Sequence, residues 1–144
     1  MRTFALKNGD LVLTGNRYTM VEGAARVQQQ LGLGLREPYG SDRFHTAWGS
    51  MIPNWLGRTI VRGVTQDVRA EVLRVIRNHI IVQNGQLKDR ATAALKPTIT
   101  AEEIISEVTD IRFTQRQDEL IVKVTIRTTG QQEFTLLTST SGGL

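Results

Sequence analysis

The residues of this sequence that could carry out chemistry gather in one stretch, residues 37–57. This stretch contains Glu37, Asp42 and His45, together with Ser41 and Ser50. Two carboxylates about 5–9 Å apart could hydrolyse a glycoside if an apolar wall raised the pKa of one of them. Asp42 could also orient His45 as a base toward a serine nucleophile. Trp48 or Trp55 could supply the apolar wall.

Structural roles for the same side chains are simpler. Glu37 follows Arg36 and Asp42 precedes Arg43, so each carboxylate can form a local ion pair. A neighbouring guanidinium lowers the pKa of a carboxyl group, which is the wrong direction for a general acid. Neither serine lies in a Gly-x-Ser-x-Gly elbow, and His45 can simply pack within the loop. We therefore expect no catalytic centre, and a peptidoglycan hydrolase using Glu37 or Asp42 is the alternative.

Metal and cofactor sites are not predicted either. The chain has no cysteine, which excludes thiolate metal sites and disulfides. His45 and His79 belong to no paired ligand motif, and His79 falls on an apolar helical stripe, as expected for a buried histidine that is hydrogen bonded. The Gly32–Gly34 pair lacks the strand–turn–helix context of a dinucleotide site.

Charge leaves a nucleic-acid partner open as a second alternative. The chain of 144 residues has a net charge of +4, with 14 Lys and Arg against 7 Asp and Glu in residues 1–96, and 4 against 7 in residues 97–144. No helix-turn-helix or aromatic ladder accompanies the basic side chains, so we expect neither a nucleic-acid nor a membrane partner. The basic side chains that could follow a phosphate backbone are Arg69, Arg74, Arg77, Lys88, Arg90 and Lys96.

The first half of the sequence predicts one hairpin and two helices. Asn8–Gly9 between apolar runs is the strongest short signal for a β-hairpin. Apolar residues at helical spacing predict a helix over residues 21–36, and a short helical turn is expected at 51–56. A long helix should follow, with the apolar stripe of residues 64–80 and Thr65 or Asp67 as its cap. It either ends at Asn84–Gly85 or continues toward Pro97.

The second half predicts an antiparallel β-meander. Thr100 and Glu103 have the spacing of a capping box, so a short helix is expected over 101–106. Strands are expected over 108–114, 120–128 and 133–138, and the tail 139–144 should be frayed. No internal repeat is evident. The fold class is α+β in one domain spanning 1–144: an N-terminal β-hairpin, central helices and a C-terminal meander.

The meander is also the candidate surface for partners. A strand at the edge of a sheet offers unpaired backbone groups to another chain, whereas an internal strand does not, and the sequence leaves both possibilities open. The residues with which an added strand would align are Leu120, Val122, Val124, Ile126, Phe134 and Leu136.

The order of these segments resembles a known family, the phage baseplate wedge proteins, also called sheath initiators or lysozyme-like wedge proteins. The resemblance is most specific in residues 33–45 (LGLREPYGSDRFH), followed by Trp48-Gly49-Ser50 and Leu56-Gly57. The Asn-Gly-Asp hairpin, the glutamines 28–30, the start of the long helix at 68–73 and the C-terminal meander agree with it. One departure is that residues 78–82 lack the Glu-Pro-Arg tripeptide that many members carry after the long helix.

The resemblance implies a structural role without catalysis or cofactor. It implies a virion protein of a contractile tail baseplate, assembled in the host cytoplasm and present in several copies in a ring. Its partners would be other wedge and hub proteins and the tail sheath, whose first ring would be nucleated by strand addition. We expect residues 37–57 to contact neighbouring chains, with the aromatic residues as anchors. The candidate contact residues are Glu37, Tyr39, Asp42, Arg43, Phe44, His45, Trp48 and Trp55.

Overall fold

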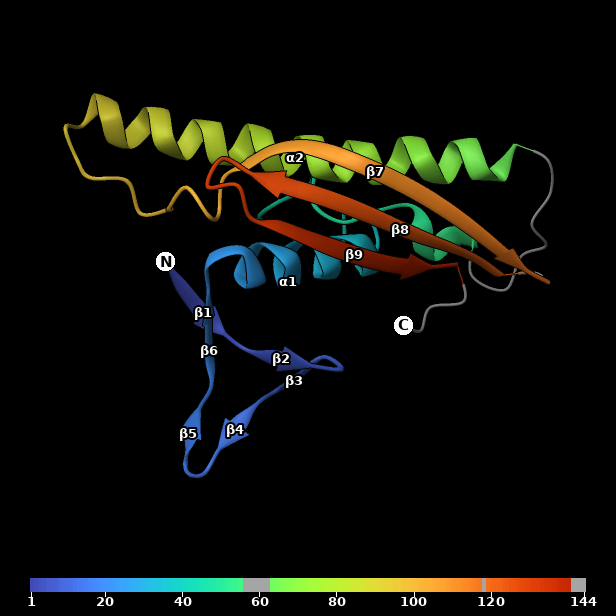
Figure 1. Ribbon diagram of the computed structural model, residues 1–144, viewed down its shortest axis with the longest axis horizontal. Helices are drawn as coiled ribbons and strands as arrows, with labels where there is room; N and C mark the ends of the chain where they lie inside the picture. Colours follow the sequence, from blue (N-terminus) through green and yellow to red (C-terminus); the bar gives the residue numbers. More distant parts are fainter. Residues whose placement is uncertain (56–62, 118, 141–144) are drawn as a thin grey trace.

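The computed structural model describes residues 1–55, 63–117 and 119–140. It confirms the predicted α+β class: small N-terminal β-structures are followed by two helices and a three-stranded antiparallel sheet (Figure 1). Residues 56 and 57, which belong to the predicted contact segment, lie outside the described residues.

The C-terminal sheet has the predicted meander topology with longer strands. Its strands are β7 (Ile105–Arg116), β8 (Glu119–Thr128) and β9 (Glu133–Ser139), in the order β7-β8-β9. Alternate residues of β8, from Leu120 to Thr128, are buried, because successive side chains point to opposite faces of a strand. The sheet therefore presents one apolar face, and β8 lies between its two neighbours.

Both predicted helices are present. Helix α1 spans Gly23–Arg36 and α2 spans Val64–Thr92, which shows that Asn84–Gly85 does not end the long helix. The 3₁₀-helix η1 (Ile52–Trp55) confirms the predicted turn. The predicted cap is wrong: Gly63 is the N-cap of α2, and no side chain caps this end.

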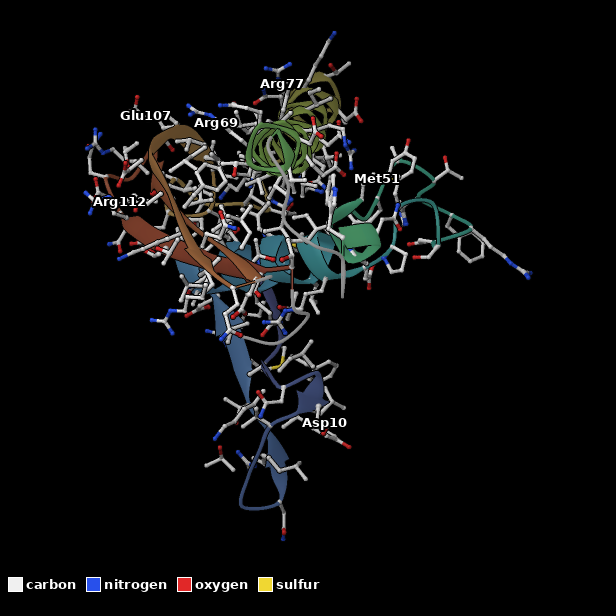
Figure 2. The ribbon with its side chains drawn as sticks, turned by 90° about the vertical axis from the view of Figure 1, so that its right-hand side faces the viewer. Asp10, Met51, Arg69, Arg77, Glu107 and Arg112 are labelled. Atoms are coloured by element: carbon white, nitrogen blue, oxygen red, sulfur yellow. The ribbon has the colours of Figure 1, made fainter. Side chains whose placement is uncertain are left out.

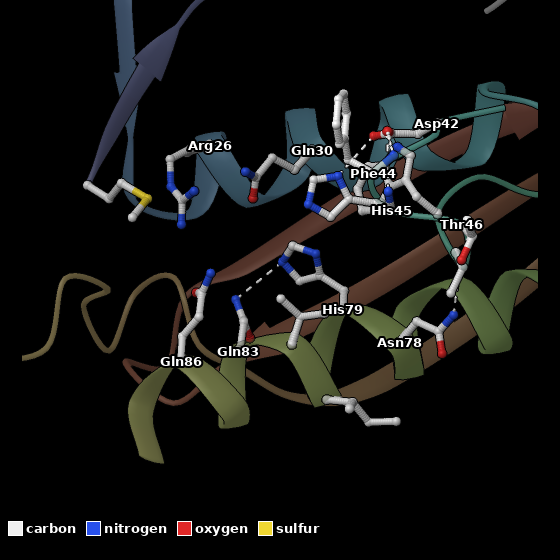
Figure 3. Close-up of a pocket in the computed structure, with 15 residues that line it drawn as sticks. Arg26, Gln30, Asp42, Phe44, His45, Thr46, Asn78, His79, Gln83 and Gln86 are labelled. Atoms are coloured by element: carbon white, nitrogen blue, oxygen red, sulfur yellow. Dashed lines mark hydrogen bonds and ion pairs between the residues drawn. The ribbon is translucent and has the colours of Figure 1, made fainter. Parts of the chain in front are cut away.

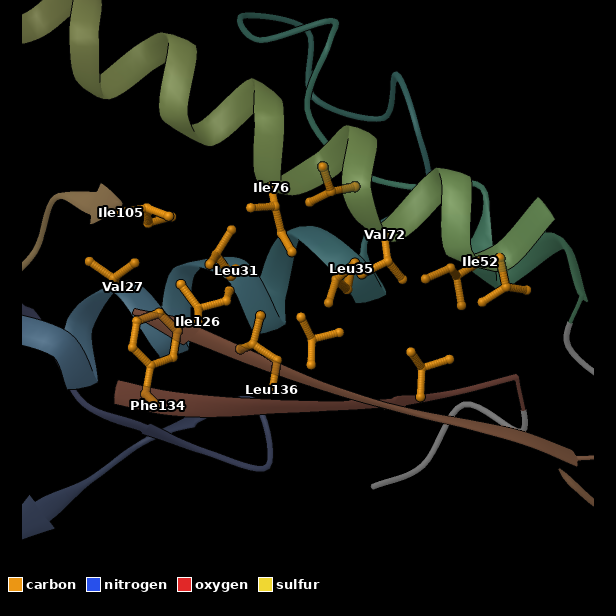
Figure 4. Packing of buried hydrophobic residues seen from close by; sticks show 14 of the residues in the cluster. Val27, Leu31, Leu35, Ile52, Val72, Ile76, Ile105, Ile126, Phe134 and Leu136 are labelled. Atoms are coloured by element: carbon orange, nitrogen blue, oxygen red, sulfur yellow. The ribbon is translucent and has the colours of Figure 1, made fainter. Parts of the chain in front are cut away.

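The core lies between the helices and one face of the sheet (Figures 2 and 4). Leu31 and Leu35 of α1 meet Val72 and Ile76 of α2 above the buried residues of the sheet, which is how two amphipathic helices and an amphipathic sheet bury their apolar faces together. The opposite face of the sheet is polar and carries Arg127, which pairs with Glu107 and Glu133. The buried apolar residues of the sheet are Ile105, Leu120, Val122, Val124, Ile126, Phe134 and Leu136.

The predicted helix over 101–106 is wrong. Residues 101–103 form a turn, and β7 begins at Ile105. Glu103 does reach back to the backbone N–H of Thr100, at 3.4 Å, as in a capping box. Its carboxylate is fully buried and pairs with Arg26 of α1, so a long-range contact outweighs the local helical signal.

The N-terminal arm, residues 1–22, is more elaborate than the predicted single hairpin. The turn at Asn8–Gly9 is present, joining β2 (Leu6–Lys7) to β3 (Asp10–Leu11). A second hairpin joins β4 (Leu13–Thr14) to β5 (Arg17–Tyr18), and β1 (Arg2–Phe4) pairs with β6 (Met20–Glu22). The arm extends away from the sheet and helices (Figure 1).

The end of the sheet is ordered further than predicted. Ser139 and Thr140 were expected to fray, but both are buried, and the Thr140 hydroxyl accepts a hydrogen bond from the Leu120 backbone N–H at 3.0 Å. Residues 141–144 of the predicted tail lie outside the described residues. Within the described part of the chain, no helix has the length and apolar character needed to cross a membrane.

Candidate interaction site

Residues 37–50 form a loop whose two ends lie side by side. The Ser50 backbone N–H donates to the Glu37 carbonyl at 2.7 Å, and the Tyr39 N–H donates to the Ser50 carbonyl at 3.0 Å. The Gly40 N–H donates to the Trp48 carbonyl at 3.1 Å. A loop with adjoining ends and its own internal contacts is an Ω-loop, a frequent carrier of function. We call this segment the Ω-loop.

Two glycines allow the Ω-loop to close against α1. Gly49 has φ +93°, and a Cβ there would lie 2.5 Å from the Pro38 carbonyl oxygen, so no other residue fits. Gly34 of α1 lies under the Trp48 ring, which a Cβ would approach to 3.2 Å. The glycines that weaken α1 by propensity are thus partly explained by this close packing.

The base of the Ω-loop is fixed to α2 by one ion pair. Glu71 pairs with Arg74 at 2.7 Å and accepts the Met51 backbone N–H at 2.7 Å. Arg74 also donates to the Gly49 carbonyl at 2.8 Å and lies 4.8 Å from the centre of the Tyr39 ring. Burial alone raises the pKa of Glu71, but Arg74 and the Met51 N–H outweigh it and hold the pKa below its usual value. The pair therefore stays charged at neutral pH.

The tip of the Ω-loop is organised by Asp42. Its carboxylate accepts the Phe44 N–H at 2.8 Å and the His45 N–H at 3.3 Å, and it lies 3.0 Å from the His45 Nδ1. These contacts, led by the Phe44 N–H and the His45 side chain, lower the pKa of Asp42. They hold the tip in a turn that presents Phe44 with 91% of its surface exposed.

This geometry does not favour the hypothesis that residues of the Ω-loop catalyse hydrolysis. Asp42 is stabilised as a carboxylate, which is unsuitable for a general acid. The Ser50 hydroxyl is buried and donates to the Leu35 carbonyl at 2.6 Å, so its proton is already engaged. The Asp42 carboxylate contacts the His45 Nδ1 at 3.0 Å and does not form the ion pair expected with Arg43. Among the residues described, no group of three or more His, Cys, Asp or Glu could hold a metal ion.

A cleft of about 660 Å³ opens beneath the tip of the Ω-loop (Figure 3). Phe44, His45 and Trp48 form one wall, and Ile81 and Val82 of α2 contribute exposed apolar side chains to the other. Amide side chains from both helices also line the cleft, and amides can both donate to and accept from a peptide backbone. These amides are Gln30, Asn78, Gln83 and Gln86.

A buried polar network forms the floor of this cleft. Gln83 accepts the Ile105 N–H through its Oε1, which fixes the orientation of its amide, and its Nε2 donates to the Glu103 carbonyl at 2.6 Å. The same Nε2 lies 3.3 Å from the His79 Nε2, which must therefore be the acceptor and carry no proton. Burial, together with the charge of Arg26, lowers the pKa of His79 to about 4. The prediction of a hydrogen-bonded core histidine is confirmed.

The structure separates the predicted contact residues into two groups. Tyr39 is half exposed, Phe44 almost fully so, and both belong to the Ω-loop. Trp48 and Trp55 are only partly exposed, because Trp48 packs on Gly34 and Trp55 packs against the core. Arg43 and His45 are exposed at the tip, while Glu37 and Asp42 are partly buried. Contact of these residues with a neighbouring chain stays a prediction.

The strand residues predicted for strand addition are not available for it. Strand β8 pairs with β7 on one side and with β9 on the other, so the backbone groups of Leu120, Val122, Val124 and Ile126 are used within the sheet. Phe134 and Leu136 of β9 are buried in the core, and their positions are paired with β8. An added strand would have to pair with the outer edge of β7 or β9 instead.

The predicted basic surface is smaller than the sequence indicates. Arg74 is engaged by Glu71 and Gly49, and Arg90 donates from its Nε to the Lys96 carbonyl. Arg69, Arg77, Lys88 and Lys96 remain exposed on or beside α2. Figure 2 shows Arg69 and Arg77 directed away from the core.

Sequence reasoning missed the residues that fix the site. Glu71 and Arg74 lie three residues apart on one helix, a spacing typical of an ion pair, but nothing local indicates that they hold a loop. Arg26 and Glu103 are 77 residues apart.

No family model matches the chain, and no curated protein or solved structure matches it.

Proposed function

We propose that this protein is a structural subunit of a phage or phage-like tail baseplate, which joins neighbouring wedge proteins and initiates sheath assembly. The proposal rests on the resemblance of residues 33–57 to baseplate wedge proteins, and on one observation in particular. Phe44 is 91% exposed at the tip of a loop that is held at its base, at its tip and along α2.

A fixed, exposed aromatic side chain is well suited to anchoring a partner. A phenylalanine on a freely moving loop would lose conformational entropy when it docks, and this loss would offset much of the free energy gained by burying its side chain. Here the turn around Asp42 has already fixed the backbone of Phe44, so docking loses less conformational entropy. Residues of this type dominate the energy of protein interfaces.

The outer edge of β7 supports the strand-addition part of the proposal. The Thr128 backbone N–H donates to the Gln132 carbonyl, and the Thr140 backbone N–H donates to the Leu120 carbonyl. Because backbone groups of a strand point alternately to its two neighbours, the even-numbered residues of β8 bond to β9 and the odd-numbered residues bond to β7. In the regular part of β7, the register then turns the backbone groups of Ile111, Phe113 and Gln115 away from β8. Such an edge can accept a strand from another chain.

The edge of β9 is a poorer candidate for strand addition. By the same alternation its outward backbone groups belong to Glu133, Thr135 and Leu137. The Gln28 side chain of α1 already donates to the Thr135 carbonyl at 2.6 Å, and α1 packs along this strand. We therefore propose β7, rather than β8 or β9, as the strand to which a sheath strand is added.

Replacement of Phe44 by Ser tests the proposed contact. The variant should fold normally, because the side chain is almost fully exposed, and it should reduce incorporation of the subunit into tail particles by at least about tenfold. Quantitative mass spectrometry of purified particles measures the incorporation. Leu95→Ser, at a position 53% exposed and outside the Ω-loop, is the matched control and should incorporate normally. Normal incorporation of Phe44→Ser would rule out the Ω-loop as the anchor.

A further inference from the structure

The N-terminal arm has an internal threefold repeat, so the expectation that the chain has no repeat is wrong. Ala5, Val12 and Thr19 are spaced seven residues apart, and each joins the next by one backbone hydrogen bond. The Ala5 N–H donates to the Thr19 carbonyl at 2.8 Å, the Val12 N–H to the Ala5 carbonyl at 3.0 Å, and the Thr19 N–H to the Val12 carbonyl at 2.8 Å. This closed cycle joins three strand pairs at one centre.

An apolar residue lies on each side of every central residue. The three triads read Phe4-Ala5-Leu6, Leu11-Val12-Leu13 and Tyr18-Thr19-Met20. Cross-strand partners lie on the same face of a β-ladder, and the pairs here are Phe4 with Met20, Leu6 with Leu11, and Leu13 with Tyr18. Alternation along the chain places the flanking residues of each triad on one side, opposite the central residue.

All six flanking side chains therefore share one face, which we call the arm face. The contact between the Phe4 and Tyr18 rings, with centroids 5.5 Å apart, links two strand pairs across it. Lys7, Asp10 and Arg17 alternate to the other side, so the arm is an amphipathic sheet. The members of the arm face are Phe4, Leu6, Leu11, Leu13, Tyr18 and Met20.

The arm face has no cover in the described chain. Five of its six side chains are 45–59% exposed, and Leu6 is partly exposed. The helices and the C-terminal sheet form the body of the molecule, and Gln29 of α1 holds the arm to it. The Gln29 side chain accepts the Leu6 N–H and donates to the Phe4 carbonyl, both at 2.9 Å. Figures 1 and 2 show the arm projecting from the body, so the body does not bury this face.

We propose that the arm face binds the arm face of a second copy of this chain, face to face about a twofold axis. The six side chains of the face are uncharged, and the charged residues that follow on the same side of the β1–β6 ladder, Arg2 and Glu22, pair with each other at 2.7 Å. The face is therefore complementary to another uncharged apolar surface. The other exposed large apolar residues in the described chain are a smaller group around the cleft, Met1, Phe44, Ile81 and Val82, and single positions at Tyr39, Met51, Leu95 and Leu137. No other described surface of a second copy therefore offers as many of them as the arm face. Because three similar strand pairs surround one centre, the arm of one copy can also stack in register on the arm of a second copy.

The area of the arm face sets the expected strength of this contact. Half-exposed side chains of this size offer on the order of 500 Å² per copy. Two faces would then bury about 1,000 Å² together, the lower limit for a specific interface. The dimer should therefore be reversible and depend on protein concentration. This inference does not depend on the proposed function.

Sedimentation equilibrium of the full chain tests the dimer. The wild-type chain should show a monomer–dimer equilibrium, and Leu13→Asn should raise the dimer Kd by about tenfold or more. Leu95→Asn, at a position of similar exposure outside the arm, should leave the Kd within about twofold of the wild-type value. Unchanged far-UV circular dichroism would show that both variants fold.

Cysteine crosslinking provides a second readout that does not require loss of the dimer. The chain has no cysteine, so one can be placed on each strand pair, at Met20, Leu11 or Tyr18. Face-to-face stacking about a twofold axis brings at least one strand pair beside its own copy, so at least one variant should form a disulfide-linked dimer, and Leu95→Cys should not.

Four results would overturn the inference. The first three are a chain that is monomeric at every concentration, a dimer whose Kd is unchanged by Leu13→Asn, and oligomers that grow beyond two copies. The fourth is a chain that is monomeric in solution but sediments with phosphatidylcholine vesicles by means of its arm. The last result would assign the arm face to lipid instead.

Discussion

Replacement of Glu103 by Gln is expected to lower the free energy of unfolding by about 3–5 kcal/mol. Glu103 is fully buried and its partner Arg26 is only 3% exposed. The carboxylate also accepts the Gly23 N–H at 3.2 Å. Loss of its charge leaves the Arg26 guanidinium buried without an anion, which costs more than the ion pair itself contributes. Urea unfolding followed by circular dichroism measures the effect.

A double variant separates the cost of the orphaned charge from the loss of packing. Arg26→Met with Glu103→Leu replaces the pair by apolar side chains, and it should be more stable than Glu103→Gln alone. Burial raises the pKa of Glu103, but Arg26 outweighs it and the net pKa is lowered. The stabilisation is therefore complete above the ordinary pKa and is lost as pH falls through the folded value. A loss below about 1 kcal/mol at neutral pH would contradict this account.

His79 should make the protein less stable in mild acid. Its pKa is about 4 in the fold against an ordinary value of 6.5, so the unfolded chain binds the proton more tightly. Stability is then complete above the ordinary value and falls as pH drops toward the folded value, by about 2 kcal/mol between pH 7 and pH 5. Urea unfolding at several pH values measures this slope.

His79→Leu is the matched variant, because it fills a similar volume and cannot bind a proton. Its stability should depend less on pH in this window than that of the wild-type chain. Identical slopes in His79→Leu and the wild-type chain would show that the imidazole is not held neutral by burial and by the charge of Arg26.

The elements of the body were predictable because their signals are local. The apolar stripe of residues 64–80 and the alternation in 120–128 correspond to α2 and β8, since periodicity follows directly from burial on one face. Asn84–Gly85 left the end of α2 open, because the sequence does not show what packs beyond it. The capping-box signal at Thr100–Glu103 predicted a helix, although Glu103 is used by Arg26 across the core.

The candidate site was predictable in its position but not in its geometry. The aperiodic segment 37–57 was expected to contact partners, and its described part does form an exposed loop. Which aromatic residues are exposed depends on tertiary packing: Gly34 makes room for Trp48, whereas Phe44 is left uncovered by the described part of the chain. The triads of the arm were visible as a seven-residue spacing, but two-residue strands are too short for a periodicity signal.

The central claim is that this chain is a stoichiometric part of a tail baseplate. The most direct measurement is quantitative mass spectrometry of purified tail particles from the source, with peptide signals converted to copies per particle. A fixed, small number of copies in every preparation is the result we predict. Absence of the chain from assembled particles would contradict the proposal and leave the Ω-loop and the edge of β7 without the partners proposed for them.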